Sequence, residues 1–255
     1  MLFDTHAHYD DEAFDGDRDG LLGHLQEAGV GAVVNVGASL LSTRRTLELT
    51  ERYHFIYGAV GVHPSEYRDL KEEDIRWLQS LASKDKVVAI GEIGLDYHWE
   101  EPGAPLQKKW FAHQLELAEQ VRLPVIVHSR DGAKDTLDIL KAWKGREIGG
   151  VIHCFSYSRE IARECLDMGF YLGIGGVATF KNARRLKEVV EYAPLDRIVL
   201  ETDCPYLAPE PYRGKRNSSL YLSYVAEAVA ALKGVDRELV EDVTWNNGRA
   251  LYGLS

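Results

Sequence analysis

Two histidines near the start of the chain, His6 and His8, are separated by a single residue. In an extended segment, side chains two positions apart point to the same side, so both imidazoles can reach one metal ion. The pattern is short, however, and by itself it more often describes two surface histidines than a metal site. Its meaning depends on what the rest of the chain supplies.

Further side chains able to bind metal follow short apolar segments elsewhere in the sequence. A carboxylate at the end of such a segment is costly to bury unless a partner satisfies it. Separate hydrogen bonds could satisfy each polar group, but one shared pair of cations would satisfy all of them together. We therefore predict a site for two divalent metal ions, with the ligands His6, His8, Glu92, His128, His153 and Asp203.

These residue types do not select one metal. Imidazole nitrogen suits zinc or manganese, whereas carboxylate and phosphate oxygen suit magnesium or manganese. Glu92 is central in the order of the predicted strands, and a carboxylate can bridge two ions. Two ions about 3.5–4 Å apart can activate a water and stabilise both the attacking and the leaving oxygen of a displacement at phosphorus. The pattern thus indicates Mg, Mn or Zn and is compatible with hydrolysis at phosphorus, although the same site could attack carbon.

The hypothesis assigns a role to each group near the reacting atoms. A metal-bound hydroxide attacks phosphorus in line, and Asp203 binds metal and accepts the proton of that water. Because Pro64 holds His63 extended, we expect His63 to contact the scissile phosphate or to protonate the leaving oxygen; the alternative is a structural imidazole. Glu201 and Asp96 have accessory roles, either on the metal or in orienting its ligands.

Other catalytic arrangements fit the sequence less well. The chain has no Gly-x-Ser-x-Gly nucleophile elbow. Alternation along a strand turns Cys154 away from His153 and Cys204 away from Asp203, so both cysteines are interpreted as small buried residues. The glycines of 173–176 lack the lysine of a phosphate-binding loop and are typical of a tight strand-to-helix turn.

The elements that must position these groups alternate between short apolar and longer amphipathic segments. The predicted strands are Leu2–Thr5, Gly31–Val36, Phe55–Val62, Val87–Ile90, Pro124–Val127, Gly150–Ile152, Phe170–Ile174 and Arg197–Leu200. The predicted helices are Arg18–Ala28, Leu40–Tyr53, Lys71–Ser83, Pro105–Val121, Lys134–Trp143, Arg159–Met168, Ala183–Tyr192 and Leu220–Leu232. Apolar strands without alternation are typical of a parallel sheet buried on both faces.

This alternation predicts an α/β fold, and we expect a TIM (β/α)8 barrel rather than an open doubly wound sheet. In a barrel the polar groups at the strand ends converge on one rim, where active sites lie. The 255 residues match the roughly 250 of this fold, so we expect a single domain spanning residues 1–255.

Composition limits the partners and the compartment. A formal net charge of −10 argues against a stable nucleic-acid complex made through a basic face, but not against an enzyme that holds one phosphate through metal ions. Three cysteines fit a reducing cytosol. No apolar run approaches the roughly 18 residues of a membrane span, and no signal peptide is visible. We therefore expect a cytoplasmic enzyme with no membrane association.

Substrate contacts are less well defined by the sequence. Basic residues in segments after strands could neutralise flanking phosphates, although ordinary loop charge is an equal alternative for each one. These residues are Arg130, Lys181, Arg213, Lys215 and Arg216. Unpaired bases could stack on one or two of the aromatic residues of the same rim, most of which we expect to be packing residues. These residues are Tyr97, Trp99, Phe155, Tyr157, Phe180, Tyr206 and Tyr212.

Taken together, the motifs resemble those of the TatD-type deoxyribonucleases, a family of metal-dependent hydrolases. The similarity spans essentially the whole chain and rests on Asp4-Thr5-His6-Ala7-His8, Gly61-Val62-His63-Pro64, Gly91-Glu92-Ile93-Gly94-Leu95-Asp96-Tyr97, Pro124-Val125-Ile126-Val127-His128-Ser129-Arg130, His153-Cys154-Phe155-Ser156, Glu201-Thr202-Asp203-Cys204-Pro205-Tyr206-Leu207 and Gly214-Lys215-Arg216-Asn217. The run Asn217-Ser218-Ser219 departs from the family pattern, in which a proline commonly lies two residues after the asparagine.

The resemblance implies a TIM barrel, the same six ligands with Glu92 as the bridge, and a catalytic role for His63. It also implies divalent-metal-dependent 3′-to-5′ exonuclease activity on single-stranded DNA, and in some members on RNA. Hydrolysis of another ester is the alternative function, since D-aminoacyl-tRNA deacylation has been assigned within the family. A scaffold without catalytic activity is the least favoured alternative, because binding alone would not require six ligands.

Overall fold

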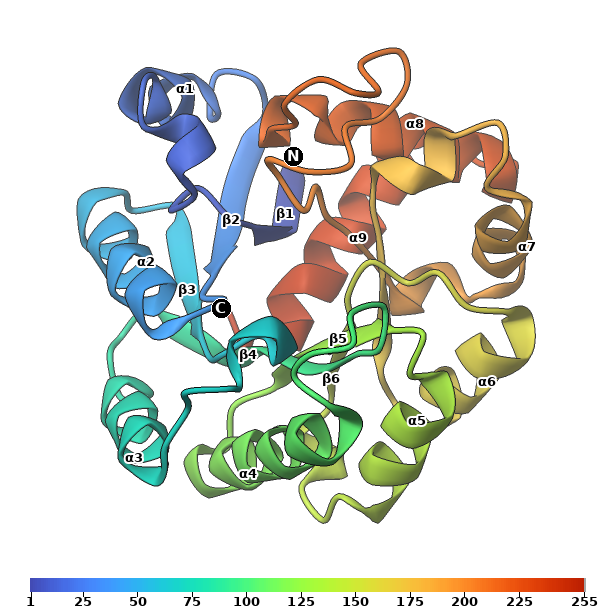
Figure 1. Cartoon of the computed structure of the whole chain (residues 1–255). Coiled ribbons are helices and arrows are strands. Elements are labelled where there is room, and N and C mark those ends of the chain that lie inside the picture. The colour runs from blue at the N-terminus through green and yellow to red at the C-terminus, as the bar shows by residue number, and fades with distance from the viewer. Residues whose placement is uncertain (255) are drawn as a thin grey trace.

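Eight parallel strands form one sheet in the computed structural model, which describes residues 1–254 and all of their side chains except that of Arg146. The strands are β1 (Leu2–Ala7), β2 (Val30–Val36), β3 (Ile56–Val60), β4 (Val87–Asp96), β5 (Val125–Arg130), β6 (Gly150–Ile152), β7 (Tyr171–Ile174) and β8 (Ile198–Leu200). They pair in chain order, and a parallel bridge between Ala7 and Cys204 joins the segment after β8 to β1. The sheet is therefore a nearly closed barrel (Figure 1), which confirms the predicted TIM (β/α)8 fold.

Helices surround this sheet between successive strands (Figure 1). The α-helices are α1 (Arg18–His24), α2 (Leu40–Arg52), α3 (Glu72–Leu81), α4 (Ala104–Val121), α5 (Ala133–Ala142), α6 (Arg159–Asp167), α7 (Arg184–Tyr192), α8 (Leu222–Lys233) and α9 (Arg237–Leu251). Short 3-10 helices are η1 (Glu12–Phe14), η2 (Pro64–Glu66), η3 (Arg146–Ile148), η4 (Gly176–Thr179), η5 (Leu195–Arg197) and η6 (Ser219–Tyr221). No helix in the described part of the chain is long and apolar enough to cross a membrane.

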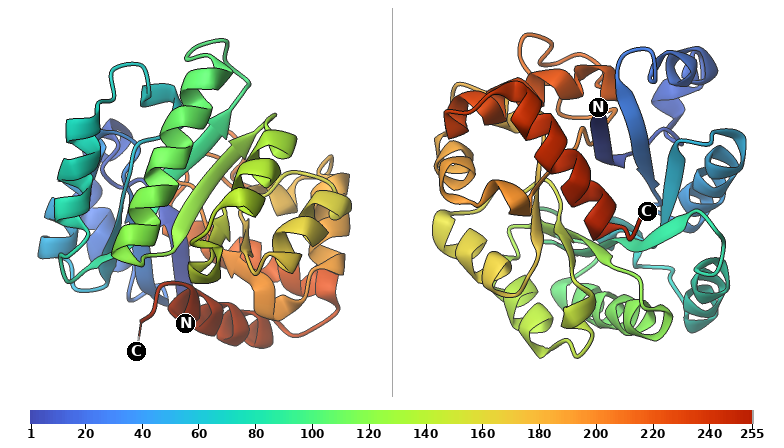
Figure 2. Two further views of the ribbon diagram at one scale, coloured as in Figure 1. Left: turned by 90° about the horizontal axis from the view of Figure 1, so that it is seen from below. Right: turned by 180° about the vertical axis from the view of Figure 1, so that it is seen from behind.

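The expectation of eight helices is wrong by one, because α9 follows α8. Figure 2 shows α9 lying across one end of the barrel. The Asn247 side chain of α9 donates to the carbonyl oxygen of Ile198, the first residue of β8, at 2.7 Å. The α9 residue Trp245 packs on Phe3 of β1 with the ring centroids 5.7 Å apart. This helix therefore closes the amino end of the barrel and leaves the carboxyl end open.

The apolar side chains divide into two clusters on the two sides of the sheet. The larger cluster lies between strands and helices and includes Val33 of β2. The smaller one includes Val34 and Val36 from the same strand and reaches Leu251 at the end of α9. Side chains along a strand alternate between faces, so the smaller cluster fills the interior of the barrel. Apolar packing therefore occupies the end near α9, and polar groups occupy the opposite rim.

Strands β1, β4 and β5 extend further than the apolar segments suggested. In the ladder between β4 and β5, Gly94 lies opposite His128 and Asp96 lies opposite Arg130. Gly94 has a φ of +142°, and a Cβ there would collide with the backbone carbonyl oxygen of His128. The strand ends that carry polar groups thus belong to the sheet itself, and glycine allows the two strands to approach closely beside the site.

Candidate metal centre

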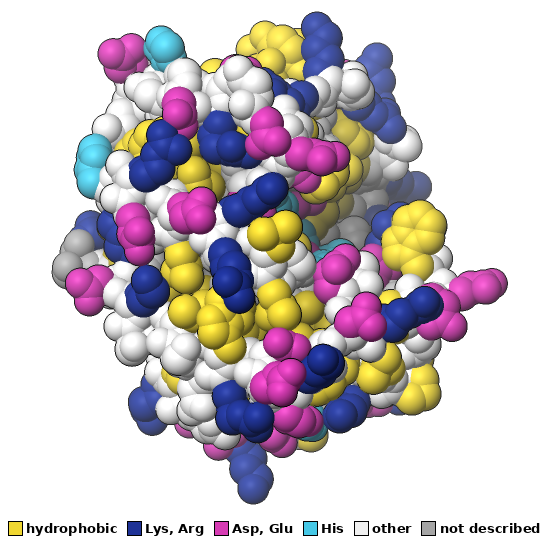
Figure 3. Space-filling model, turned by 60° about the vertical axis from the view of Figure 1, so that its left-hand side comes forward, with side chains coloured by type: hydrophobic (Ala, Val, Ile, Leu, Met, Phe, Trp, Pro, Cys, Tyr) yellow, Lys and Arg dark blue, Asp and Glu magenta, His cyan; other side chains and the backbone are white. Residues whose placement is uncertain are grey.

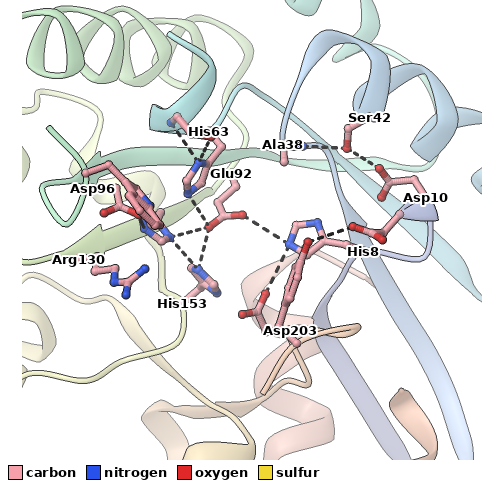
Figure 4. A pocket seen from close by; sticks show the side chains of 15 residues that line it. His8, Asp10, Ala38, Ser42, His63, Glu92, Asp96, Arg130, His153 and Asp203 are labelled. Atoms are coloured by element: carbon pink, nitrogen blue, oxygen red, sulfur yellow. Dashed lines mark hydrogen bonds and ion pairs between the residues drawn. The ribbon is translucent and has the colours of Figure 1, made fainter. Parts of the chain in front are cut away.

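The carboxyl ends of the strands enclose a cavity of about 560 Å³. Its lining residues are His8, Asp10, Asp11, Ala38, Ser42, His63, Ser65, Glu92, Asp96, Trp99, His128, Arg130, His153, Asp203 and Tyr206. Figure 4 shows Glu92 near the middle of this cavity, with His8 and Asp203 on one side and His63 and His153 on the other. Five of the six predicted ligands line the cavity, and the sixth, His6, lies beside His8.

One group of donor atoms comes from the end of β1, including the residue after it, and from the segment after β8. The Nε2 atoms of His6 and His8 are 3.0 Å apart. Asp203 Oδ1 lies 3.7 Å from the His6 nitrogen and 3.5 Å from that of His8. Oε2 of Glu92 faces the same two nitrogens at 3.5 and 3.6 Å. We call His6, His8 and Asp203 the β1/β8 group.

A second group comes from β5 and from the residue after β6. His128 Nδ1 and His153 Nε2 each lie 2.8 Å from Oε1 of Glu92. The two imidazole nitrogens are 3.3 Å apart. His63 Nε2 approaches the same oxygen at 3.8 Å. We call His128 and His153 the β5/β6 group, so that each oxygen of Glu92 faces a different group.

Charges within the cluster keep its carboxylates ionised. Burial alone would raise the pKa of Glu92, but the charges of His153 and His63 and hydrogen bonds from His128 and His153 hold it well below its usual range. Burial likewise opposes ionisation of Asp203, yet its hydrogen bond with His8 and nearby imidazole charges lower its pKa. Carboxylates bind metal in their ionised form, which is the form that this environment favours.

The pKa values of His8 and His63 are shifted in opposite directions within this cluster. For His8, the hydrogen bond with Asp203 and the charges of Glu92, Asp203 and Asp10 outweigh burial and raise its pKa to about 9. Burial dominates for His63 and lowers its pKa to about 4. The backbone N–H of Ser65 donates to Nδ1 of His63 at 3.2 Å. His63 is therefore neutral near pH 7, with the proton on Nε2, the nitrogen that faces Glu92.

A buried hydrogen-bond network holds Asp203 beside the first strand. The Asp4 carboxylate in β1 accepts from the Thr202 backbone N–H at 2.9 Å and from the Thr202 hydroxyl at 2.6 Å. The Ser219 hydroxyl donates to the same carboxylate at 2.5 Å, and the Ser219 N–H donates to the Tyr9 hydroxyl at 2.9 Å. A proline at position 219 could supply neither donor. The departure from the family pattern therefore adds two hydrogen-bond donors to this network.

Two buried amides of α4 position the ends of β3 and β4. The Gln114 side chain accepts from the Val62 N–H at 2.8 Å and donates to the Val62 carbonyl at 3.1 Å, directly before His63. The Gln107 side chain makes the equivalent pair of bonds with the backbone of Asp96, at 2.8 and 2.7 Å. A single helix thus fixes two of the segments that surround Glu92.

Asp96 and Glu201 lie behind the β5/β6 group. Asp96 Oδ2 is 3.1 Å from Nε2 of His128, and Glu201 Oε1 is 3.6 Å from Nδ1 of His153. Among the described residues, the buried atoms without a hydrogen-bond partner are Nδ1 of His6, Nδ1 of His153 and Oε2 of Glu201. A donor atom from each of these three side chains lies within 4.8 Å of the other two. The Glu201 carboxylate is therefore placed against imidazoles of both groups.

These donor sets fit divalent cations. The combinations His6–His8–Asp203 and His63–Glu92–His128 each bring three ligand atoms within 4.8 Å of one another. Two imidazole nitrogens only 3.0 Å apart and buried carboxylates around them form a mixed nitrogen and oxygen environment that suits zinc or manganese. None of the three cysteines, Cys154, Cys165 and Cys204, belongs to either combination.

Sequence reasoning missed Asp10 and Ser42, which also line the cavity. The Asp10 carboxylate accepts from the Asn35 side chain at 2.8 Å and from the Ser42 hydroxyl at 2.6 Å. The position of Asp10, two residues after His8, repeats the spacing between His6 and His8 and could have signalled it. Ser42 carries no comparable signal, because a serine near the start of α2 is ordinary.

The five basic residues predicted to contact the substrate differ in whether they line the cavity. Arg130 lines the cavity, and Figure 4 shows it beside Asp96 and His153. Arg216 forms an ion pair with Asp17 at 2.6 Å and lies over the Phe14 ring. The remaining three, Lys181, Arg213 and Lys215, are likewise not among the residues that line the cavity. The structure therefore places one of the five predicted basic residues at the site.

Comparison with known proteins agrees with this geometry. The model of the family described as TatD related DNase matches residues 3–253. The uncharacterized metal-dependent hydrolase YabD of Bacillus subtilis (strain 168) is 46% identical, and the match covers 100% of both chains. The 3′-5′ ssDNA/RNA exonuclease TatD of Citrobacter koseri is 31% identical over 100% of both chains.

A solved structure agrees as well. The crystal structure of YJJV, a TatD homologue from Escherichia coli K12, matches with a TM-score of 0.94 at 30% identity and covers 100% of this chain and 98% of that chain. The donor cluster, the fold and these relatives lead to the same conclusion. The chain belongs to the TatD-related DNase family and is a metal-dependent hydrolase.

Proposed function

We propose that this protein is a divalent-metal-dependent phosphodiesterase that removes nucleotides from the 3′ end of single-stranded DNA or RNA. The observation that carries the proposal is the position of Glu92, whose two oxygens face different groups of imidazoles. Oε2 lies 3.5 Å from His6, and Oε1 lies 2.8 Å from both His128 and His153. A carboxylate between two donor groups is the arrangement expected for a bridged pair of cations.

When bound, two cations would make a water more acidic and neutralise charge on the attacking and leaving oxygens. His6, His8 and Asp203 would hold one cation, and His128 and His153 would hold the other. Asp203 also accepts the proton of the attacking water through its carboxylate, which this environment keeps ionised. His63 donates from Nε2 to a non-bridging oxygen of the scissile phosphate and orients the ester for in-line attack.

The charge of the cavity explains why binding of the substrate would require metal ions. Five lining residues are acidic, and Arg130 is the only arginine or lysine among them. A phosphodiester would be repelled from this cavity until cations compensate the carboxylates. Arg130 then pairs with the phosphate next to the scissile one, as a charge-assisted hydrogen-bond donor.

The experiment is a hydrolysis assay on a single strand labelled at its 5′ end, after chelation and add-back of Mg²⁺, Mn²⁺ or Zn²⁺. We expect stepwise shortening from the 3′ end, loss of activity on chelation and recovery with metal. A strand blocked with a 3′ phosphorothioate linkage is the control for direction, and it should not be shortened. Activity that survives thorough chelation contradicts the proposal, and so does metal-dependent hydrolysis of misacylated tRNA without shortening of any strand.

A further inference from the structure

Two aromatic side chains at the mouth of the cavity are exposed although their residue types normally pack inside. Trp99 is 60% exposed and Tyr206 is 54% exposed, and both line the cavity. Figure 3 shows the hollow in the surface, with histidine visible in its depth and hydrophobic side chains near its edge. An exposed aromatic ring beside a reaction site offers a surface on which an unpaired base can stack.

The other aromatic residues of this rim are buried or half-buried, and their rings or hydroxyls contact other groups of the protein. Phe155 and Phe180 are buried. The hydroxyl of Tyr97 bonds to Asp135 at 2.9 Å, and that of Tyr157 bonds to Ser129 at 2.9 Å. Tyr212 stacks on Tyr221 with ring centroids 4.2 Å apart. Trp99 and Tyr206 thus stand apart from the five others.

Tyr206 is held firmly beside the β1/β8 group. Its hydroxyl donates to Asp11 at 3.0 Å, and its backbone N–H donates to the carbonyl of Asp203 at 2.9 Å. The side chain of Asn217 donates to its carbonyl at 2.8 Å. Its ring meets His8 edge to face at 6.4 Å between centroids. The ring is therefore fixed at both ends, although about half of the residue is exposed.

Trp99 lines the same cavity from the segment after β4. The His98 ring packs against it with 4.8 Å between centroids and an interplanar angle of 83°. The backbone N–H of His98 donates to Asp96 at 3.0 Å, which ties this segment to the carboxylate behind His128. In the strand order β4 and β8 are four strands apart, so the two rings rise from opposite sides of the barrel.

We propose that Trp99 and Tyr206 form a base-stacking clamp, with each ring covering one of the two unpaired bases that flank the scissile phosphate. This inference rests on the proposed function, because it places the phosphate at Glu92, between the two groups. Bases on either side of such a phosphate reach outward to opposite rims. Stacking requires a free base face, so the clamp selects unpaired strand ends and tolerates any base sequence.

The test compares two single strands of equal length. One carries ordinary bases, and every nucleoside of the other is an abasic tetrahydrofuran analogue. The measured quantity is the ratio of kcat/KM for the first strand to that for the second, with protein loaded with Mn²⁺. We expect a ratio of at least about tenfold for the native protein, and a decrease of about fivefold or more for each of Trp99→Ala and Tyr206→Leu.

Two controls separate stacking from structure. Tyr206→Phe keeps the ring and should keep the native ratio. Leu239→Ala changes an exposed apolar residue of α9, at the other end of the barrel, and should not alter the ratio. A native ratio near one overturns the clamp and leaves the phosphodiesterase proposal standing. An unchanged ratio in both ring variants also overturns it. If neither strand is hydrolysed, both the proposed function and the clamp are overturned.

Discussion

The two groups of donor atoms around Glu92 are anchored in different ways. In the β1/β8 group, Nδ1 of His8 contacts the backbone carbonyl of Val36 at 2.9 Å, and the Asp203 N–H donates to the His6 carbonyl at 2.9 Å. In the β5/β6 group, His128 is backed by the carboxylate of Asp96 at 3.1 Å. One group is held mainly by the backbone that closes the barrel, and the other by ionisable side chains.

The two kinds of anchor therefore have different effects. Backbone anchors stabilise the positions of the ligands, and carboxylate anchors adjust the basicity of the imidazoles. A carbonyl anchor orients an imidazole and cannot be removed by substitution of a side chain. A carboxylate anchor also raises the basicity of the imidazole, and a single substitution can remove it. We therefore expect the β1/β8 group to be structurally robust and the β5/β6 group to set metal affinity.

The largest effect is expected from Glu92→Gln, since Glu92 serves both groups. The amide keeps the shape of the side chain but removes the charge that would bridge two cations. We expect a loss of at least about 10³-fold in kcat/KM and a metal content below that of the native protein. Elemental analysis and the hydrolysis assay measure the two quantities. Retention of the native metal content and rate would eliminate the bridging role.

Asp203→Asn comes next, because it changes only the β1/β8 group. We expect a decrease of about 10²-fold in kcat/KM and a loss of metal from one site, while the other site stays loaded. The variant should remain folded, since the Asp4–Thr202 bonds that hold this segment are untouched. Unaltered metal stoichiometry together with unaltered turnover would refute the assignment of Asp203.

Glu201→Gln tests the carboxylate behind His153. The amide keeps an oxygen that can accept from the Cys154 N–H, which the carboxylate accepts at 2.5 Å. We expect metal affinity to weaken by about 10- to 100-fold, measured by calorimetric titration of metal-free protein. Asp96→Asn is the matched variant behind His128. If neither substitution weakens binding, the distinction between the two kinds of anchor is wrong.

The smallest effect is expected from Ser219→Pro, which changes the support of the β1/β8 group without touching a donor atom. It removes the bonds from Ser219 to Asp4 and to Tyr9. We expect the free energy of unfolding to fall by about 1–3 kcal/mol, measured by urea titration. Ser219→Ala, which keeps the N–H donor, should lose less. Equal stability of all three proteins would show that the network contributes nothing.

Much of the fold was predictable because its signals are local. The apolar segments without alternation indicated strands that β1 to β8 confirm. The sequence did not predict helix α9, because α8 already completes the eight-fold alternation. The position of α9 depends on its contacts with β1 and β8. The lengths of β4 and β5 were underestimated, since their ends carry polar residues that a pattern of apolar side chains does not count.

Residue type and alternation are properties of neighbouring positions, so the chain alone reveals which side chains are available as donors and that they follow strands. How these donors are shared depends on contacts between distant strands. Whether each oxygen of Glu92 faces a different group depends on strands brought together around a barrel. Ion pairing of Arg216 with Asp17 and exposure of Trp99 were equally undetermined. Such contacts join residues that are distant along the chain, so the spacing of neighbouring residues does not predict them.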